Sequence, residues 1–293
     1  MADPQGVIRE MRETILAQRV HYETHSHTPL CKHAVGTPEE YAAVAEQRGL
    51  RGIVVTCHNP MPDGFSARVR MSESEFDQYL DLVARARDAW AGRIDVRLGL
   101  EADFFAGYES WLERQIGSAD FHYVLGSVHP QIDEFRQRYW DNDPTEFQRT
   151  YFRLLADAAE TNLFDCLAHP DLVKNATADA WKPDQIIADI RAALDRIAAT
   201  GIAMELNTSG VNKVIPEMNP FPEMLVEMQQ RGIPVVVGAD AHQPERVAAG
   251  FEAALDLLAE CGYTHVSIFL ERQRREIPIA TVRSSLIGPL PVG

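Results

Sequence analysis

The 293-residue sequence lacks the features that mark membrane, secreted and nucleic-acid-binding proteins. No apolar run reaches the roughly 18 residues needed to span a bilayer, and the first ten residues contain no apolar stretch typical of a secretory signal. Basic residues are few, because 28 Lys and Arg stand against 43 Asp and Glu, for a net charge of −15. A protein that binds a phosphate backbone needs a basic surface, so we expect neither nucleic acid nor a membrane as a partner.

Cysteine is also scarce. The four cysteines are scattered along the chain, with no CxxC pair and no evident disulfide framework. This pattern predicts a cytoplasmic protein in a reducing compartment. The hydrophobic content of 45% is sufficient for a large core. The length suits one α/β barrel domain, and we expect its core over about residues 20–270, with a C-terminal tail after it.

Seven short apolar runs have the composition of buried strands, being partly β-branched or aromatic and often bounded by Gly, Pro or Asn. They cover residues 20–27, 52–58, 94–101, 121–127, 164–169, 202–207 and 234–240. Helix-start signals lie between them. Thr37-Pro38-Glu39-Glu40 places a cap, a first-turn proline and an acidic residue in order. We expect further helices to open at Ser72, Asp143, Asn219-Pro220 and Gln243-Pro244.

The alternation of strands and helices predicts parallel strands joined by right-handed crossovers. Seven such units could close into a barrel or remain open as a doubly wound sheet. Polar residues stand at the end of nearly every predicted strand. We favour the barrel, because there the carboxyl ends of the strands converge on one face, where functional sites are built.

Most of the ten histidines stand where a predicted strand ends. His25 and His27 are two residues apart, so on a strand they project to the same side. Asp240 and His242 repeat this spacing at the end of the last run. Any one of these residues could be an ordinary surface or ion-paired side chain. His21, His122 and His265 lie away from strand ends, and we expect them to be structural or surface residues.

Together, nine side chains are expected at one end of the barrel. They are His25, His27, His33, His58, Glu101, His129, His169, Asp240 and His242. Imidazole and carboxylate groups suit Zn²⁺, Mn²⁺ and Fe²⁺. Nine ligands are too many for one ion and about right for three, if a carboxylate bridges.

These residues resemble the PHP (polymerase and histidinol phosphatase) family, and within it the histidinol-phosphate phosphatases. The matching segments occur in family order and are His25–Ala34, Thr37–Tyr41, His58–Pro62, Gly99–Asp103, Gly126–His129, Ala168–Leu172, Glu205–Gly210 and Asp240–His242. The resemblance implies a distorted (β/α)7 barrel with a trinuclear metal site at the carboxyl ends of the strands.

The resemblance also implies which residues hold each ion. The first ion would be held by His25, His27, Glu101 and Asp240. The second would be held by His33, His58 and His242. The third would be held by His129, His169 and Glu101, with Glu101 as the bridge.

The sequence departs from the family pattern at two single positions and in one short segment. Glu23 and Cys57 stand where the family usually has Asp. Asn212 and Lys213 stand where histidinol phosphatases tend to carry an Arg. Arg grips phosphate with a planar fork, whereas Lys offers a point charge. We therefore expect either weak hydrolysis of histidinol phosphate or a preference for another phosphoester.

The predicted activity is that of a metal-dependent phosphoesterase acting on a small-molecule phosphate monoester. A metal-bridging hydroxide would be the nucleophile, with no covalent protein intermediate. The candidate cations for phosphate are Arg136, Arg138, Lys174 and Lys213. The candidate hydrogen-bond partners for the ligating imidazoles are Glu23, Asp103 and Asp171.

Other functions remain open at this point. The same cluster could hydrolyse another phosphomonoester or a phosphodiester, including a cyclic one. A non-catalytic metal-binding barrel would be expected to have lost ligands, and none of the nine is missing. A polymerase-associated proofreading domain fits the acidic composition less well, and an amidohydrolase-like barrel lacks this order of motifs.

Overall fold

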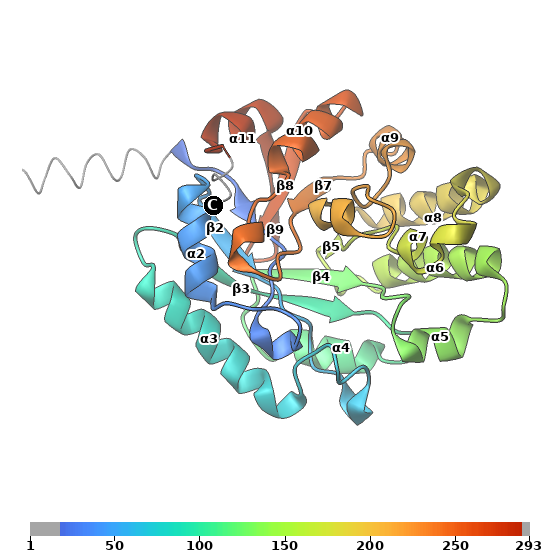
Figure 1. The fold of residues 1–293 in the computed structure, drawn as a ribbon, viewed down its shortest axis with the longest axis horizontal. Coiled ribbons are helices and arrows are strands. Elements are labelled where there is room, and N and C mark those ends of the chain that lie inside the picture. Colours follow the sequence, from blue (N-terminus) through green and yellow to red (C-terminus); the bar gives the residue numbers. More distant parts are fainter. Residues whose placement is uncertain (1–17, 289–293) are drawn as a thin grey trace, which may run out of the picture.

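The computed structural model describes residues 18–288, and its centre is a seven-stranded parallel sheet in which each strand pairs with the next along the chain (Figure 1). The strands are β1 (Tyr22–Glu23), β2 (Gly52–Val55), β3 (Asp95–Asp103), β4 (Tyr123–Ser127), β5 (Cys166–Leu167), β6 (Ala203–Asn207) and β7 (Val235–Gly238). Beyond β1 and β7, the backbone N–H of His27 donates to the carbonyl of Ala241 at 2.9 Å, and that of Ala241 donates to the carbonyl of His25 at 2.9 Å. The sheet is therefore a nearly closed barrel, as the sequence predicted.

Helices surround the strands on the outside of the barrel (Figure 1). They are α2 (Pro38–Gln47), α3 (Phe76–Ala89), α4 (Glu109–Ile116), α5 (Asp133–Tyr139), α6 (Pro144–Glu160), α7 (Val173–Ala176), α8 (Ile187–Thr200), α9 (Pro222–Gln230) and α10 (Phe251–Glu260). The predicted capping box at Thr37 is formed at the start of α2. The box at Ser72 opens a 3-10 turn that leads into α3. Tyr79 docks α3 on the barrel by donating its hydroxyl to the carbonyls of Val55 at 2.8 Å and Gly99 at 2.7 Å.

The alternation of side chains along β3 decides which of them reach the barrel interior. Leu100 and Ala102 are fully buried in the apolar layer that contains the helix faces. Because successive residues of a strand point to opposite faces, Gly99, Glu101 and Asp103 point into the barrel. Two carboxylates therefore enter the barrel interior near its carboxyl end.

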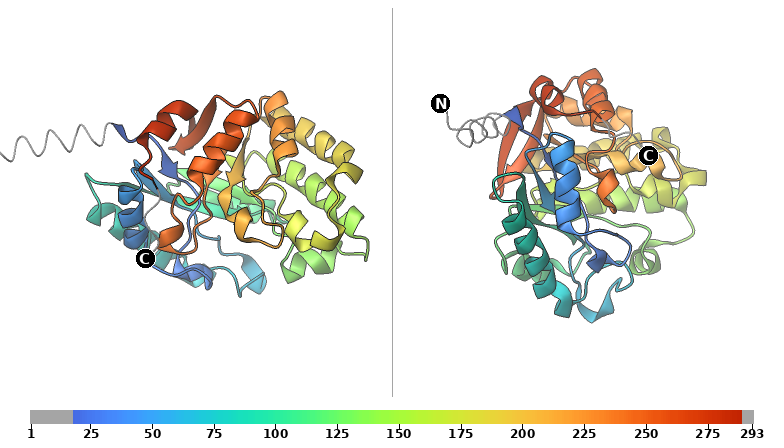
Figure 2. Two further views of the ribbon diagram at one scale, coloured as in Figure 1. Left: turned by 45° about the horizontal axis from the view of Figure 1, so that its top comes forward. Right: turned by 60° about the vertical axis from the view of Figure 1, so that its left-hand side comes forward.

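A hairpin that the sequence did not predict covers the amino end of the barrel (Figure 2). It consists of β8 (His265–Leu270) and β9 (Gln273–Pro278), which pair antiparallel. Phe269 stacks on Tyr123 with ring centroids 5.4 Å apart, and the backbone N–H of Arg272 donates to the carbonyl of His122, just before β4, at 3.0 Å. With an apolar plug at this end, polar side chains gather at the opposite, carboxyl end.

One sequence expectation about helix starts was wrong. Asn219-Pro220 is a cis peptide bond and does not open a helix, because α9 begins two residues later, at Pro222. The segment after residue 270, expected to be a C-terminal tail, contains β9 and α11 (Ile279–Ser285), and Ile279 and Val282 on α11 are buried. The N-terminal segment considered as a signal lies outside the described residues. Within residues 18–288, no helix is long and apolar enough to cross a membrane.

Candidate metal centre

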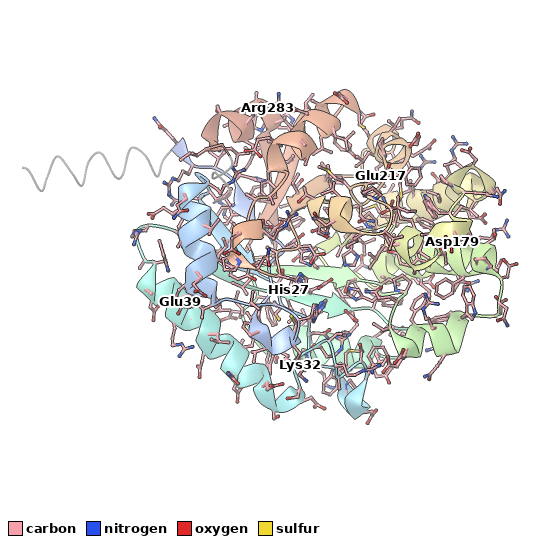
Figure 3. The ribbon with its side chains drawn as sticks, viewed as in Figure 1. His27, Lys32, Glu39, Asp179, Glu217 and Arg283 are labelled. Atoms are coloured by element: carbon pink, nitrogen blue, oxygen red, sulfur yellow. The ribbon has the colours of Figure 1, made fainter. Side chains whose placement is uncertain are left out.

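The nine side chains singled out in the sequence converge at the carboxyl end of the barrel, and His27 lies near the middle of the molecule in Figure 3. Glu101 is the hub of this cluster. Its Oε2 lies 2.8 Å from Nδ1 of His58 and 3.4 Å from Nε2 of His25. Its Oε1 lies 3.1 Å from Nε2 of His169 and 3.4 Å from Nε2 of His129. One carboxylate thus faces histidines from four different strand ends.

A second carboxylate, Asp240, completes the other side of the cluster. Its Oδ1 lies 3.2 Å from Nε2 of His27 and 3.6 Å from Nε2 of His25. The Nε2 atoms of His33 and His242 face each other at 2.9 Å. The ring of His242 also stacks on that of His27, with centroids 4.0 Å apart. The histidine rings are therefore packed together with their nitrogen atoms turned toward a common centre.

Several buried polar atoms in this cluster lie close to one another but make no hydrogen bond of suitable geometry with the described residues. They include Nε2 of His25, Nε2 of His27, Nδ1 of His58 and Oε2 of Glu101. A buried polar atom without a partner costs free energy, so such a group needs another occupant. Possible ligand atoms lie within 4.8 Å of one another in the sets His25, His27 and Asp240, His27, His58 and His242, and His58, Glu101 and His129. This donor chemistry fits divalent ions that accept imidazole and carboxylate.

The far nitrogen of several rings is held by a second group, which fixes the direction of the ring. Nδ1 of His129 lies 2.9 Å from Oδ1 of Asp103, the partner expected from the sequence. Nδ1 of His25 lies 2.7 Å from Oε1 of Glu205, which the sequence analysis had not assigned. Nδ1 of His33 lies 2.7 Å from the carbonyl of Cys31. Such partners select the tautomer that leaves Nε2 free to bind a metal ion.

Glu23 and Asp171, the other two expected imidazole partners, have different roles. Glu23 accepts backbone N–H bonds from His25, Ala239 and Ala248, and so ties β1 to the segment after β7. Asp171 accepts from the side chain of Asn219, from the backbone N–H of Phe221 and from Lys174. Neither carboxylate contacts an imidazole nitrogen, so both predictions were wrong.

The electrostatics of the cluster call for positive charge near the carboxylates. Burial alone would raise the pKa of Glu101, but the surrounding histidines hold it well below its usual value. Burial alone would lower the pKa of His129, but Asp103 and Glu101 raise it to about 10. By contrast, burial lowers the pKa of His58 to about 4 and that of His242 to about 3. These two rings stay neutral at pH 7 and keep a lone pair available for a metal ion.

Two residues of the cluster adopt an unusual backbone conformation. His169 and Asp240 have φ angles of 28° and 49°, which non-glycine residues rarely adopt. The surrounding structure holds them there. Glu205 accepts the backbone N–H of His169 at 2.8 Å, and Ser209 donates its hydroxyl to Asp240 at 3.0 Å. Strain of this kind is characteristic of functional sites, where neighbouring groups over-determine the geometry.

Two cavities open from the cluster and share the side chains of His33, His58 and His129. The larger, of about 620 Å³, also contains Lys213 and Asn212. The smaller, of about 400 Å³, lies under the loop between β2 and α3. Of the four cations predicted to contact phosphate, Lys213 lines a cavity, and its Nζ lies 3.8 Å from Oδ2 of Asp240.

The other three predicted cations do not line either cavity. Lys174 is fully buried, and its Nζ contacts Asp171 at 3.0 Å, Glu217 at 3.1 Å and the carbonyl of Met218 at 2.7 Å. With three oxygen partners, it serves to join the segment after β5 to the segment before α9.

Arg136 and Arg138, near the end of α5, point to neighbouring aromatic rings and loop carbonyls. Arg136 donates to the carbonyl of Ala176 at 3.1 Å, and Arg138 donates to that of Ala106 at 2.6 Å. Lys174, Arg136 and Arg138 thus contact other groups and lie outside both cavities in this structure, which gives no support to the expectation that they bind phosphate.

Cys57, which departs from the family pattern, lies against the cluster. Its sulfur, the sulfur of Cys31 and a ring nitrogen of His27 all lie within 4.8 Å of one another. The hydroxyl of Thr28 donates to the Cys57 sulfur at 3.2 Å. The sulfur thus occupies a buried position beside the candidate ligand His27.

Comparisons with known proteins agree with this geometry. The PHP domain family model matches residues 23–209. A probable histidinol-phosphatase of Deinococcus radiodurans is 40% identical over 246 residues, covering 82% of this chain and 93% of the relative. The histidinol-phosphatase of Bacillus subtilis is 24% identical over 262 residues, covering 79% of this chain and 97% of the relative.

Solved structures show the same fold. The histidinol phosphate phosphatase of Lactococcus lactis, complexed with zinc, L-histidinol and phosphate, superposes with a TM-score of 0.72 at 20% identity, covering 87% of this chain and 98% of that chain. A putative histidinol phosphatase of Listeria monocytogenes gives a TM-score of 0.70 at 18% identity, covering 79% and 99%. The shared barrel, the length of the family match and the 40% identity together show that this chain belongs to the PHP domain family, as a histidinol-phosphatase-like phosphoesterase.

Proposed function

We propose that this chain hydrolyses the phosphate monoester of histidinol at a centre of about three divalent metal ions. The observation that carries the proposal is the convergence of seven histidines, Glu101 and Asp240 at one end of the barrel. Several of their ring nitrogens and one oxygen of Glu101 are buried and make no hydrogen bond within residues 18–288. The name of the 40% identical relative supports histidinol phosphate as the substrate. The zinc in the Lactococcus lactis complex supports a divalent ion of the zinc, manganese or iron type.

The ligand sets that we propose are those implied by the family resemblance, and the grouping of His25, His27 and Asp240 in the structure supports the first of them. His25, His27 and Asp240 would hold one ion, with Glu101 shared. His33, His58 and His242 would hold a second, and His129 and His169 would hold a third on the other oxygen of Glu101. Ions bound here would lower the pKa of a shared water, giving the bridging hydroxide expected from the sequence, and would neutralise phosphate oxygens.

Side chains of this chain would orient the metal ligands and contact the phosphate. Glu205 and Asp103 fix the rings of His25 and His129, so that Nε2 of each faces Glu101. Lys213 brings positive charge to the larger cavity, where it can contact a phosphate oxygen. No protein nucleophile is needed, because the attack on phosphorus is made by water rather than by a side chain.

The substrate assignment is tested with a panel of phosphate esters on the metal-loaded protein. Phosphate release is measured with histidinol phosphate, unrelated phosphomonoesters, and linear and cyclic phosphodiesters. We expect the highest kcat/KM with histidinol phosphate, as the name of the 40% identical relative suggests, and this result would overturn the weaker activity or different preference that the sequence predicted from Asn212. A clear preference for another ester would support a phosphoesterase with a different substrate. No phosphate release from any ester would contradict the proposal.

A different phosphomonoester is the second candidate, and the observation in its favour lies in the larger cavity. Asn212 and Lys213 line this cavity, where related histidinol phosphatases were expected to provide an Arg. The neutral amide of Asn212 supplies no charge, and Lys213 is shared with Asp240 at 3.8 Å. If no other guanidinium reaches the phosphate, all phosphomonoesters would bind weakly through their phosphate group. The substrate would then be selected by contacts to its alcohol part.

Replacing Asp103 with Asn is expected to reduce kcat/KM by about ten- to a hundred-fold, because the amide no longer fixes the His129 ring as the carboxylate does. Asp103 lies 2.9 Å from Nδ1 of His129 and also pairs with the buried Arg70. Steady-state kinetics and metal analysis of the variant provide the measurement. Glu113→Gln, on the outer face of α4, serves as the matched acidic control. Unchanged kinetics in Asp103→Asn would show that this bond does not support the site.

A further inference from the structure

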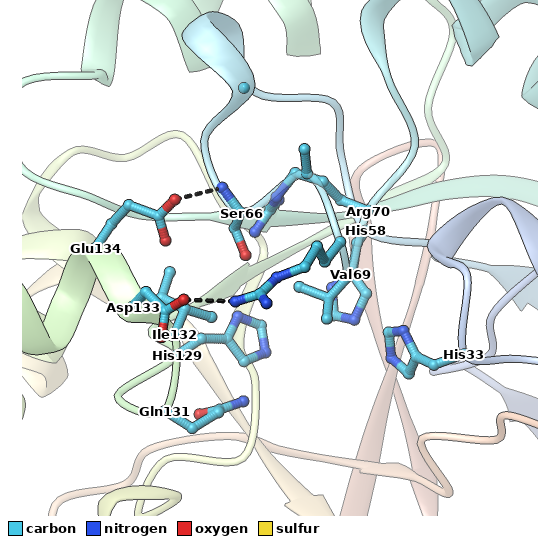
Figure 4. A pocket seen from close by; sticks show the side chains of 13 residues that line it. His33, His58, Ser66, Val69, Arg70, His129, Gln131, Ile132, Asp133 and Glu134 are labelled. Carbon is cyan, nitrogen blue, oxygen red and sulfur yellow. Dashed lines mark hydrogen bonds and ion pairs between the residues drawn. The ribbon is translucent and has the colours of Figure 1, made fainter.

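The loop between β2 and α3 forms one wall of the smaller cavity. Residues 64–70 of this loop face residues 131–134, which follow β4, across the cavity. Figure 4 shows His58, His129 and His33 exposed to the same space. This wall therefore shares a cavity with three of the candidate metal ligands.

Three cations of the described residues line the two cavities, and two of them have other roles. Arg70 is buried and donates to the carbonyl of Asn59 at 2.9 Å, to the side chain of Asn59 at 3.2 Å and to Asp103. Lys213 presents one point charge, close to Asp240. The third cation is Arg68, which lines the smaller cavity. Arg68 is thus the remaining cation with a planar fork of N–H donors.

The backbone on both sides of Arg68 is held, while its side chain extends into solvent. The backbone N–H of Ser66 donates to Glu134 at 2.7 Å, and Lys32 donates to the carbonyl of Ala67 at 2.7 Å. Arg70, two residues further along, is anchored in the interior. By contrast, the side chain of Arg68 is 86% exposed. Its position at the cavity is therefore fixed by the loop and needs no large ordering of backbone.

Within residues 18–288, the guanidinium of Arg68 pairs with Asp133 alone, at 2.6 Å (Figure 4). The side chain of Asp133 is itself 64% exposed. An exposed ion pair of this kind contributes little stability, because water screens it and two side chains must be ordered. A phosphate dianion beside bound metal ions can therefore replace Asp133 as the partner of Arg68, forming two parallel N–H···O bonds.

We propose that Arg68 is the phosphate-binding guanidinium of this chain, presented by the β2–α3 loop instead of by the segment after Asn207–Gly210. Asp133 holds the side chain over the cavity in the absence of substrate and releases it when phosphate binds. This assignment rests on the proposed phosphoesterase function. It accounts for a histidinol-phosphatase-like site in which Asn212 and Lys213 replace the expected Arg.

The first test removes the guanidinium. Arg68→Ala is expected to weaken inorganic phosphate binding to the metal-loaded protein by about ten- to a hundred-fold, measured by calorimetry, because a charge-assisted contact is lost. kcat/KM should fall by a similar factor for histidinol phosphate and for p-nitrophenyl phosphate, which share only the phosphate. Arg68→Lys should fall between wild type and Arg68→Ala. The control is Arg191→Ala, which removes an Arg that is 52% exposed and paired with Glu227 at 2.7 Å on the outer helices.

The second test removes the competing carboxylate. Asp133→Asn is expected to tighten phosphate binding by a few-fold, about the worth of an exposed ion pair. Most of this gain should disappear in the Arg68→Ala background, because the two residues act on one another. A gain of equal size in both backgrounds would show that Asp133 acts on phosphate directly, and would overturn its role as the partner that Arg68 exchanges.

Two results would overturn the assignment of Arg68 itself. One is phosphate binding by Arg68→Ala within about two-fold of wild type, with unchanged metal content. The other is a loss confined to histidinol phosphate, which would place Arg68 at the alcohol rather than at the phosphate. A third result separates the two proposals. If the wild-type protein binds phosphate, Arg68→Ala weakens that binding, and the wild-type protein still hydrolyses no ester, then the proposed function fails while the assignment of Arg68 stands.

Discussion

Replacing His242 with Ala is expected to lower phosphoester hydrolysis by about a thousand-fold or more, because the loss of a ligand removes several kcal/mol of metal-based stabilisation of the transition state. Nε2 of His242 faces Nε2 of His33 at 2.9 Å, and its ring stacks on that of His27. Because His242 is only partly buried, the truncation should leave the barrel folded. The measurement is kcat/KM together with circular dichroism and metal content, and the variant should contain less metal than wild type.

The matched control for this variant is His265→Ala. His265 is an exposed histidine at the start of β8, away from the cluster. Its truncation should leave hydrolysis, fold and metal content unchanged. Near-normal turnover by metal-replete His242→Ala would remove His242 from the ligand set, and the same test applies to His27 and His129.

Removal of the metal ions is expected to abolish hydrolysis and to lower the melting temperature by about 10 °C. The activity is lost because no group then activates water or neutralises the phosphate oxygens. Stability falls because ions bound at a thousand times their dissociation constant contribute about 4 kcal/mol, and each kcal/mol shifts the melting temperature of a chain of this size by about 2–4 °C. The buried Glu101 and the partly buried Asp240 would also lose the positive charge of the ions.

This second prediction is measured by treating the protein with a chelator, removing the chelator, and recording thermal unfolding and hydrolysis. Zn²⁺, Mn²⁺ and Fe²⁺ are then added back separately. At least one of them should restore both the activity and the melting temperature. Full activity in the stripped protein, or identical melting of the stripped and loaded forms, would be incompatible with a metal centre of this kind.

The sequence was sufficient to predict the barrel, because its strands are marked in two independent ways. Each strand is an apolar run, and nearly all of these runs are followed by polar residues such as Glu101 or His129, which mark the carboxyl end of the strand as part of a site. The β8–β9 hairpin was missed because its second strand, Gln273–Pro278, is mostly exposed and charged. Strand signals based on apolar residues do not detect such a segment.

The candidate ligands could be located from sequence because strand ends converge in a barrel, whatever the details of packing. The orientation of these ligands was harder to predict. Glu205 is an acidic residue inside the buried run of β6, two residues before Asn207, and this position was a signal that could have identified it as the partner of His25. The roles of Glu23 and Asp171 depended on backbone groups brought together only by the fold.

The cations were the part that the sequence could not assign. Lys174 follows a strand end as a phosphate-binding residue would, but Glu217 and the carbonyl of Met218, from a distant segment, enclose its ammonium. Arg68 lies in a long loop that carries no strand-end signal. The conformation of that loop, set by Arg70 and Glu134, brings Arg68 to the cavity.

The most direct test of the metal centre is the metal content of the protein purified without chelator, measured by elemental analysis against protein concentration. Convergence of nine ligand residues predicts about three divalent ions per chain, since nine side chains exceed the roughly four to six ligands of one ion and, with Glu101 shared and water completing each site, suffice for about three. The Glu101→Gln variant should retain fewer ions, because the carboxylate lies between the groups of histidines. A content near zero in the wild-type protein that added Zn²⁺, Mn²⁺ or Fe²⁺ does not raise would contradict the account.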